Sequence, residues 1–187
     1  MKRLVLIGLL LVAVAAVPVG ASTFLRMSQA DLVRNSAAVV QGQVIKVHSF
    51  WNPSGQVIMT EALVQVEEKV LGSAPSVVVV RTFGGTVDGY TVEAHGFPKF
   101  RANERVLLYL EAEKDGATRV TGYQQGQFRI VRDKFGAEIA VPAVDDEANV
   151  VSPDGRPTAR AKAVRLDALK DSIRGEARRV GRPTLEN

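Results

Sequence analysis

The sequence predicts a mainly β protein, a closed or partly open antiparallel barrel with a short N-terminal helix and a C-terminal amphipathic helix. Three observations support this prediction. Residues 38–141 contain six or seven segments rich in β-branched and aromatic residues, separated by turns of Gly, Pro, Asn and Asp. These segments follow one another in hairpin order, and helical periodicity occurs only near the two ends. A β-sandwich is the alternative architecture.

The composition is that of a globular protein with one core. Of the 187 residues, 46% are hydrophobic and 24% are charged, and cysteine is absent. A chain without cysteine has no disulfide framework, no thiolate zinc site and no cysteine nucleophile. About 165 residues follow the N-terminal stretch, which is enough for one domain.

The N-terminus has the three parts of a secretory signal peptide. Lys2 and Arg3 form a positive region, residues 4–17 form an apolar run, and small residues follow Pro18. We predict a signal peptide over residues 1–21, and the alternative is an uncleaved N-terminal anchor. Export without disulfides is typical of a bacterial periplasmic or secreted protein.

The basic residues lie mainly in the C-terminal tail. Without Lys2 and Arg3, 22 basic residues face 20 acidic ones, a net charge of +2. Residues 156–187 hold nine basic and four acidic residues, which leaves a net charge of −3 for residues 22–155. The calculated pI near 9.6 therefore reflects the tail.

The first elements follow from local signals. Ser28 is a typical N-cap, with Asp31 in the first turn of a short helix. Residues 38–51 form a long predicted strand in which Gly42 indicates a bend or bulge. After the turn at residues 52–55, residues 57–71 alternate between apolar and polar side chains, which predicts a hairpin.

The later segments continue the barrel. The apolar run Val77–Val80 predicts a strand buried on both faces. Further strands are predicted at the ranges 105–110, 118–123, 127–132 and 137–141. Residues 22–143 would then form the barrel domain.

The C-terminal part is predicted to be a linker followed by a helix. Residues 144–157 are polar and contain Pro and Gly, and residues 158–187 form the predicted amphipathic helix and basic tail. The residues expected to pack this helix on the barrel are Val164, Leu166, Leu169 and Ile173. Membrane contact through the tail or through an uncleaved N-terminus is an alternative role, and the basic residues concerned are Arg160, Lys162, Arg165, Arg174, Arg178 and Arg179.

Several segments carry a resemblance to known families. They are residues 37–44, Trp51, Gly55, residues 64–72, Gly84, Gly85 and residues 104–110. In these segments the chain resembles uncharacterised exported bacterial proteins and segments found beside matrixin-type metalloprotease domains. The order of elements is similar to the netrin-like OB barrel of the tissue inhibitors of metalloproteinases, over roughly residues 30–142. The resemblance implies an OB-like barrel.

The inhibitory mechanism of that family cannot be transferred to this chain. The inhibitors chelate the zinc of their target through an N-terminal cysteine. Here the predicted mature N-terminus is Ser22, and the chain has no cysteine.

No catalytic or metal-binding signature is present in the sequence. The two histidines, His48 and His95, lack metal-ligand spacing, and no nucleophile elbow surrounds a serine. We therefore assign no catalytic, cofactor or metal residues. We do not expect nucleic-acid binding either, because residues 22–155 are net negative and lack an RNP-like aromatic signature.

The segment 84–103 is longer than most connections between strands, and long connections often carry function. Its glycines also suit tight turns at the end of a barrel, so both interpretations stay open. The candidate binding loop consists of Gly84, Gly85, Tyr90, His95, Phe97 and Phe100.

The leading hypothesis for function is a non-enzymatic exported module that recognises a protein or an envelope polymer. The resemblance adds an association with an extracellular protease system. The alternatives are a small secreted hydrolase and a membrane-anchored structural component of the envelope.

Overall fold

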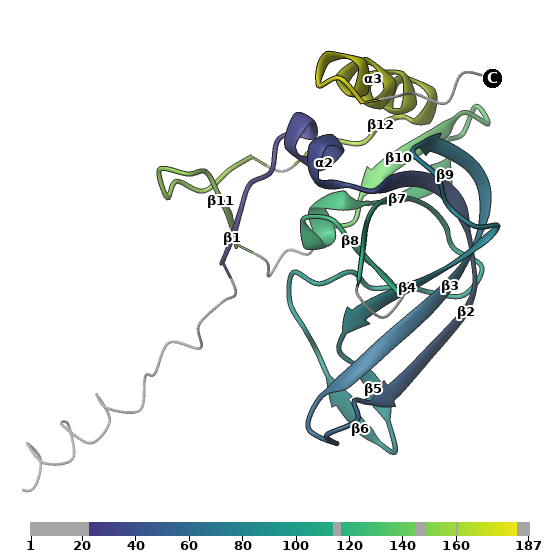
Figure 1. Ribbon diagram of the computed structural model, residues 1–187, viewed down its shortest axis with the longest axis vertical. Coiled ribbons are helices and arrows are strands. Elements are labelled where there is room, and N and C mark those ends of the chain that lie inside the picture. The colour runs from purple at the N-terminus through teal and green to yellow at the C-terminus, as the bar shows by residue number, and fades with distance from the viewer. Residues whose placement is uncertain (1–22, 114–116, 145–148, 160, 183–187) are drawn as a thin grey trace, which may run out of the picture.

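The computed structural model describes residues 23–113, 117–144, 149–159 and 161–182 (Figure 1). The predicted signal peptide lies outside the described residues. Figure 1 shows a strongly curved sheet with helix α3 across one end and a small two-stranded sheet at the opposite end.

Five strands close into a barrel, which confirms the predicted fold class and excludes the β-sandwich. Their order around the barrel is β7–β2–β3–β4–β8, and β8 pairs back with β7. Four of the five seams are antiparallel, and the β4–β8 seam is parallel. The strands are β2 (Ala38–Trp51), β3 (Ile58–Leu71), β4 (Val77–Phe83), β7 (Arg105–Ala112) and β8 (Thr118–Val120).

Other strands extend the barrel or lie beside it. β9 (Gln127–Arg132), β10 (Glu138–Pro142) and β12 (Val164–Arg165) continue the sheet outward from β7. β5 (Gly85–Val87) and β6 (Tyr90–Val92) form a separate antiparallel pair.

The first described strand pairs with a segment of the predicted linker. β1 (Thr23–Leu25) runs parallel to β11 (Asn149–Val151). Neither strand was predicted, because each is only three residues long and its pairing partner is remote in the sequence.

The long strands β2 and β3 bend because their register shifts. Their pairing is irregular at three points, one of which lies between Gln41 and Gly42, where a bulge was predicted. Bulges increase the local twist, so one long hairpin can contribute to opposite sides of a small barrel.

Two strands are buried on both faces and supply two separate cores. In β2, Val40 points into the barrel, and Val39 points to the layer between the sheet and the helices. In β7, Leu108 points into the barrel, and Tyr109 points to the layer between the sheet and the helices. Each strand therefore joins the interior of the barrel to the helical layer.

Helix α2 (Gln29–Asn35) begins at the predicted cap. The Ser28 hydroxyl accepts a hydrogen bond from the Asp31 amide at 3.1 Å, and the Asp31 carboxylate accepts one from the Ser28 amide, which completes a capping box. The Ser28 hydroxyl and amide also lower the pKa of the Asp31 carboxyl.

Helix α3 (Leu166–Arg179) packs on the sheet as predicted, but it begins later than residue 158. Leu166, Leu169 and Ile173 are buried in the helical layer. Val164, predicted to pack there too, lies in β12 before the helix and is 40% exposed. An amphipathic pattern alone does not show where a helix starts. Here no capping side chain marks the first residue of α3.

Two further expectations were wrong. Val77 and Val79 are only partly buried, so the run Val77–Val80 alternates along β4 and is not buried on both faces. The strand predicted for residues 118–123 ends at Val120, and a 3₁₀-helix follows as η1 (Tyr123–Gly126). Gly122 precedes η1 with left-handed backbone dihedrals, which an extended strand does not adopt.

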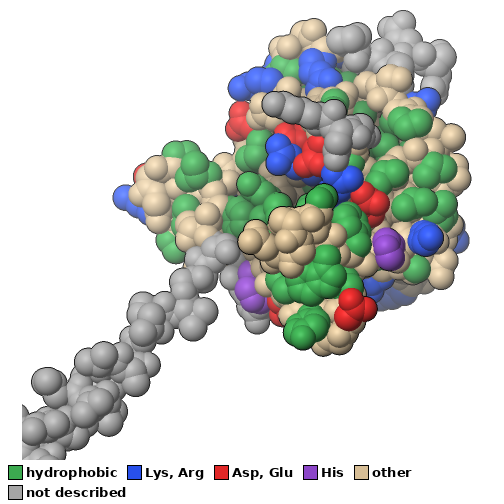
Figure 2. Space-filling model, turned by 60° about the horizontal axis from the view of Figure 1, so that its bottom comes forward, with side chains coloured by type: hydrophobic (Ala, Val, Ile, Leu, Met, Phe, Trp, Pro, Cys, Tyr) green, Lys and Arg blue, Asp and Glu red, His purple; other side chains and the backbone are tan. Residues whose placement is uncertain are grey.

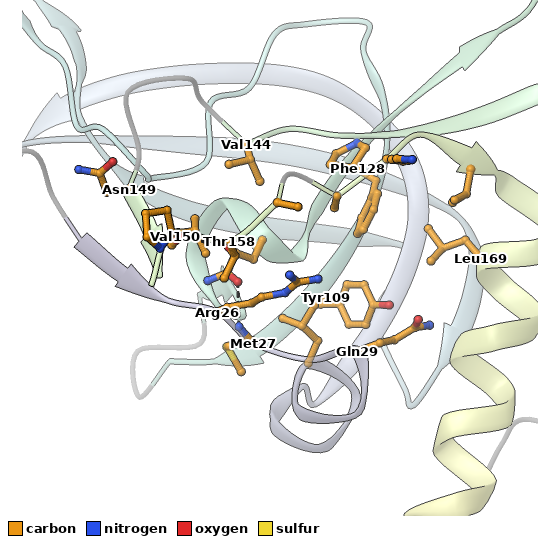
Figure 3. A pocket seen from close by; sticks show the side chains of 18 residues that line it. Arg26, Met27, Gln29, Tyr109, Phe128, Val144, Asn149, Val150, Thr158 and Leu169 are labelled. Carbon is orange, nitrogen blue, oxygen red and sulfur yellow. Dashed lines mark hydrogen bonds between the residues drawn. The ribbon is translucent and has the colours of Figure 1, made fainter. Parts of the chain in front are cut away.

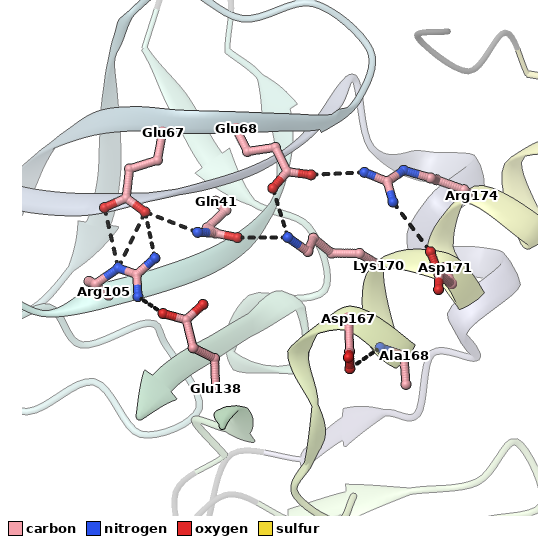
Figure 4. A network of polar contacts seen from close by, with 10 residues as sticks. All are labelled: Gln41, Glu67, Glu68, Arg105, Glu138, Asp167, Ala168, Lys170, Asp171 and Arg174. Carbon is pink, nitrogen blue, oxygen red and sulfur yellow. Dashed lines mark hydrogen bonds and ion pairs between the residues drawn. The ribbon is translucent and has the colours of Figure 1, made fainter. Parts of the chain in front are cut away.

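Charged side chains join α3 to the barrel (Figure 4). The Glu68 carboxylate accepts hydrogen bonds from Lys170 at 2.7 Å and from Arg174 at 2.8 Å. Beside it, Arg105 binds the Glu67 carboxylate at 2.7 Å and also pairs with Glu138. These half-buried pairs place β3, β7, β10 and α3 in one connected network.

The network makes the stability of the protein depend on pH in the acid range. The Arg105 guanidinium, followed by the Gln41 amide, holds the pKa of the Glu67 carboxyl below its ordinary value of 4.5. The charged form therefore stabilises the fold fully above pH 4.5, and this contribution is lost as the pH falls through the lowered pKa. We expect Glu67→Gln to lower the free energy of unfolding by about 1 kcal/mol near neutral pH and to flatten the acid dependence.

Urea unfolding across the acid range would measure this effect. Arg105→Lys is the matched variant, because it keeps the charge and loses the two-pronged geometry; it should show an intermediate slope. Equal acid slopes for Glu67→Gln and the natural protein would contradict the assignment.

Among the described residues, no helix is both long enough and apolar enough to cross a bilayer.

Candidate binding face

The candidate loop forms one end of the barrel. The connection between β4 and β7 contains the β5–β6 hairpin, which lies opposite α3 in Figure 1. Figure 2 brings this end forward and shows hydrophobic side chains gathered there, with a few charged side chains around them. The surface around the hairpin is called the hairpin face below, and it comprises Trp51, Phe83 and residues 84–92.

Gly85 allows the hairpin to lie directly on the barrel. A Cβ atom at this position would come 2.3 Å from the Ser49 hydroxyl and 2.4 Å from the Thr60 hydroxyl. Its φ of +131° is also strained for other residues. The Thr60 hydroxyl donates to the Gly84 carbonyl at 2.6 Å, which joins the start of the hairpin to β3. This part of the predicted loop is therefore ordered by close packing.

Tyr90 is the most exposed aromatic residue of the hairpin face, with 66% of its surface accessible. It lies edge-on to Trp51, at 6.0 Å between ring centroids. Trp51 is the last residue of β2, so the pair joins the tips of two hairpins. All three residues of β6 are exposed.

The outer edge of β6 has open main-chain groups. β6 pairs with β5, and no other strand of the described residues pairs with it. An unpaired edge presents N–H and C=O groups that can hydrogen-bond to another extended chain. The strand is short, which limits the length of chain that it can bind.

A cavity of about 250 Å³ lies between the hairpin and the barrel end. Its lining is rich in hydroxyl groups, and these mostly bind protein partners. Ser49 and Thr60 hydrogen-bond to each other at 2.8 Å, and Thr82 donates to the Pro98 carbonyl at 3.1 Å. Glu93 and Lys99 are the charged residues of the lining. The hydroxyls thus support the hairpin from below.

Phe97 belongs to a separate aromatic group beside the hairpin face. Its ring contacts those of Phe24, Phe83 and Tyr123 at 5.0–6.2 Å, in edge-on geometry. Tyr123 has a φ of +58°, which a bulky residue adopts only when its surroundings hold it there. Through these ring contacts, β1 and η1 pack against the segment between β6 and β7 that contains Phe97.

The six candidate residues of the loop lie in different places in the structure. Gly84, Gly85 and Phe100 line the cavity, and Phe100 is 9% exposed and packs in the barrel core. Tyr90 lies at the exposed hairpin, whereas His95 is partly buried in the segment that leads to Phe97. Among these six residues, Tyr90 has the exposure expected of a contact residue.

Sequence reasoning missed Trp51, Phe83 and Tyr123 as members of this region. Trp51 was assigned to a strand, and its position directly before the turn at 52–55 was the one available signal. Phe83 directly precedes Gly84 in the chain, which was the signal available for it. Tyr123 reaches the region through the closure of the barrel, for which no local pattern exists.

His48 and the acidic residues of the described ranges form no metal-binding cluster. His48 stacks on Phe50 at 6.0 Å between ring centroids. In the part of the chain that the structure describes, no three His, Asp or Glu side chains are grouped to hold a metal ion.

The basic tail mostly forms pairs within the protein. Arg165 binds Asp167, Arg179 binds Glu176, and Arg174 binds both Glu68 and Asp171. Arg182 donates to the carbonyls of Val33 and Ser36. Through these contacts Arg174 and Arg182 join the tail to β3 and to the segment around α2. Arg160, also named for membrane contact, lies outside the described residues.

Comparisons with protein-family models, with curated proteins and with solved structures found no match for this chain.

Proposed function

We propose that the protein is a non-catalytic binding module whose hairpin face recognises an extended segment of another exported protein. The observation that carries this proposal is the exposed Tyr90–Trp51 pair beside the unpaired edge of β6. The main chain of β6 would supply hydrogen bonds, and the two aromatic rings would supply contact area.

The residue types at the hairpin face support a protein partner. Tyr and Trp are enriched in the residues that dominate binding energy, because each buries a large rigid surface and keeps a polar atom. Val92 and Phe83 are also exposed, and both line the cavity beneath the hairpin. Exposed apolar patches on soluble domains mark interaction sites.

The position of the face also supports the proposal. In OB barrels, the loop between the first two barrel strands takes part in ligand binding. The corresponding turn here joins β2 to β3 and lies next to Trp51. This argument is an analogy at the level of the fold.

Panning a library of linear peptides against the purified protein tests the proposal. We expect enriched peptides whose affinity falls at least tenfold, about 1.4 kcal/mol, in Tyr90→Ala. Phe135→Ala is the matched control, because Phe135 is 83% exposed in the turn between β9 and β10. The bound peptides should shift the amide resonances of residues 90–92.

Two results would overturn the proposal. One is a set of peptides that bind Tyr90→Ala and the natural protein equally well. The other is co-sedimentation with insoluble peptidoglycan that depends on Tyr90 without any peptide binding, which would assign the face to an envelope polymer. Because of the resemblance to segments beside matrixin-type proteases, an exported protease is the first whole protein to test.

A further inference from the structure

A second cavity (Figure 3) lies among α2, β11 and α3, which Figure 1 places away from the β5–β6 hairpin. Its volume is about 430 Å³, within the range of small-molecule sites. β11 lies on one side of the cavity, and α3, which contributes Leu169 to the lining, lies on the other. The cavity is therefore a product of the β1–β11 pairing and of the docking of α3.

The floor of this cavity is apolar. Leu32 and Leu169 come from the two helices, and Tyr109 and Phe128 come from the sheet. Burial raises the pKa of the Tyr109 hydroxyl, which the neighbouring Gln29 amide opposes only in part. The phenol is thus neutral at physiological pH, and the floor carries no charge.

Among the described residues, the charged side chains that line this cavity are all basic. Arg26 and Lys162 are its charged lining residues, both are exposed, and none of the 18 lining residues is acidic. Figure 3 shows the Arg26 side chain pointing towards Tyr109. The positive charges at the rim would attract an anionic ligand. A cationic ligand would find no acidic side chain among the described lining residues.

Two polar side chains of the wall, Gln125 and Thr158, already have protein partners. Gln125 accepts from the Met27 amide and donates to the Leu25 carbonyl, both at 2.9 Å. The Thr158 hydroxyl donates to the Val150 carbonyl at 3.0 Å. These bonds hold the wall together. The groups left to bind a head group include the two cations and the Gln29 side-chain nitrogen, which has no hydrogen-bond partner among the described residues.

From this arrangement we propose that the cavity binds an amphiphile with one apolar chain and one anionic head group, a carboxylate or a phosphate. The chain would lie on the floor formed by Leu32, Phe128 and Leu169. The head group would lie between Arg26 and Lys162. Charge-assisted hydrogen bonds of this kind are stronger than neutral ones, and arginine suits both head groups.

Isothermal titration calorimetry of the purified full-length protein tests the proposal. The probes are dodecanoate, dodecyl phosphate and dodecyltrimethylammonium, each below its micelle concentration. We expect saturable binding of one or both anions and none of the cation. The comparison of dodecanoate with dodecyl phosphate distinguishes the two head groups.

Variants locate the binding site. The double variant Arg26→Gln with Lys162→Gln should weaken anion binding at least tenfold, because both substitutions remove charge and preserve length. Arg34→Gln is the matched control, since Arg34 is an exposed arginine that pairs with Asp31 outside the cavity. Ala161→Trp should also block binding, because Ala161 is an exposed lining residue that an indole would extend across the cavity.

Three outcomes would overturn the proposal. These are equal binding of the cationic and anionic amphiphiles, anion binding that the double variant leaves unchanged, and adsorption to phosphatidylglycerol vesicles without binding of either single-chain anion. Melting temperatures of all variants show whether they fold. None of these results depends on the hairpin face, so Tyr90→Ala should bind dodecanoate as the natural protein does.

Discussion

Ile173→Ala is expected to lower the free energy of unfolding by about 2–5 kcal/mol, the usual cost of such a truncation in a packed core. Ile173 is fully buried, and it lies with Leu166, Leu169 and Ala177 in the layer between α3 and the sheet. Truncation removes apolar contacts and leaves a void, because the strands beneath cannot collapse towards the helix.

Val164→Ala is the control for this prediction. Val164 was expected to pack with Ile173, but it is 40% exposed in β12, so its truncation should cost less than about 1 kcal/mol. Urea unfolding curves of both variants provide the measurement. If both variants lose the same free energy of unfolding, α3 does not pack on the core as described.

Gly42→Ala is expected to destabilise the barrel by about 1–3 kcal/mol or more, although it adds a single methyl group. The new Cβ atom would lie 2.3 Å from the main-chain oxygen of Gln65 and 2.9 Å from a methyl carbon of Val64. The first of these contacts is with the backbone of the paired strand, so relief requires movement of β3 itself.

Gly175→Ala is the matched control and should act in the opposite direction. Gly175 lies within α3, and a Cβ atom there would have no neighbour within 4 Å. Alanine in a helix interior is more stable than glycine by about 0.5–1 kcal/mol. Thermal unfolding of both variants measures the difference, and a Gly42→Ala protein as stable as the natural one would refute the close approach of β2 and β3.

The parts of the fold that were predictable depend on local rules. A high content of β-branched and aromatic residues identified β2 over its full observed range, Ala38–Trp51, and alternation identified its hairpin partner β3. Ser28 and Asp31 identified the start of α2 through a capping box that spans four residues. Each of these signals acts within one element or between neighbours in the chain.

The errors share a different cause. Val77–Val80 has the composition of a doubly buried strand, but its burial depends on which layers cover β4. Phe100 was counted as a loop residue, and the barrel core encloses it. Burial of a given side chain is set by the packing of distant segments, which a local pattern does not encode.

The two proposed binding surfaces were harder to predict from the sequence than the barrel was. The long connection and Tyr90 directed attention to the hairpin face, whereas its partner Trp51 is contributed by another hairpin. For the second cavity no signal was recognised, because it requires Thr23 to pair with Asn149 and α3 to pack beside them.

Short-range signals were sufficient to predict the fold class, the positions of the long strands and the cap of α2, because residue composition, alternation and capping act within a few neighbouring residues. Long-range packing sets which seam of the barrel is parallel, where β1 pairs and which side chains meet at the two cavities. These features arise when remote segments close into one barrel, and the free energy that selects them comes from packing over the whole molecule.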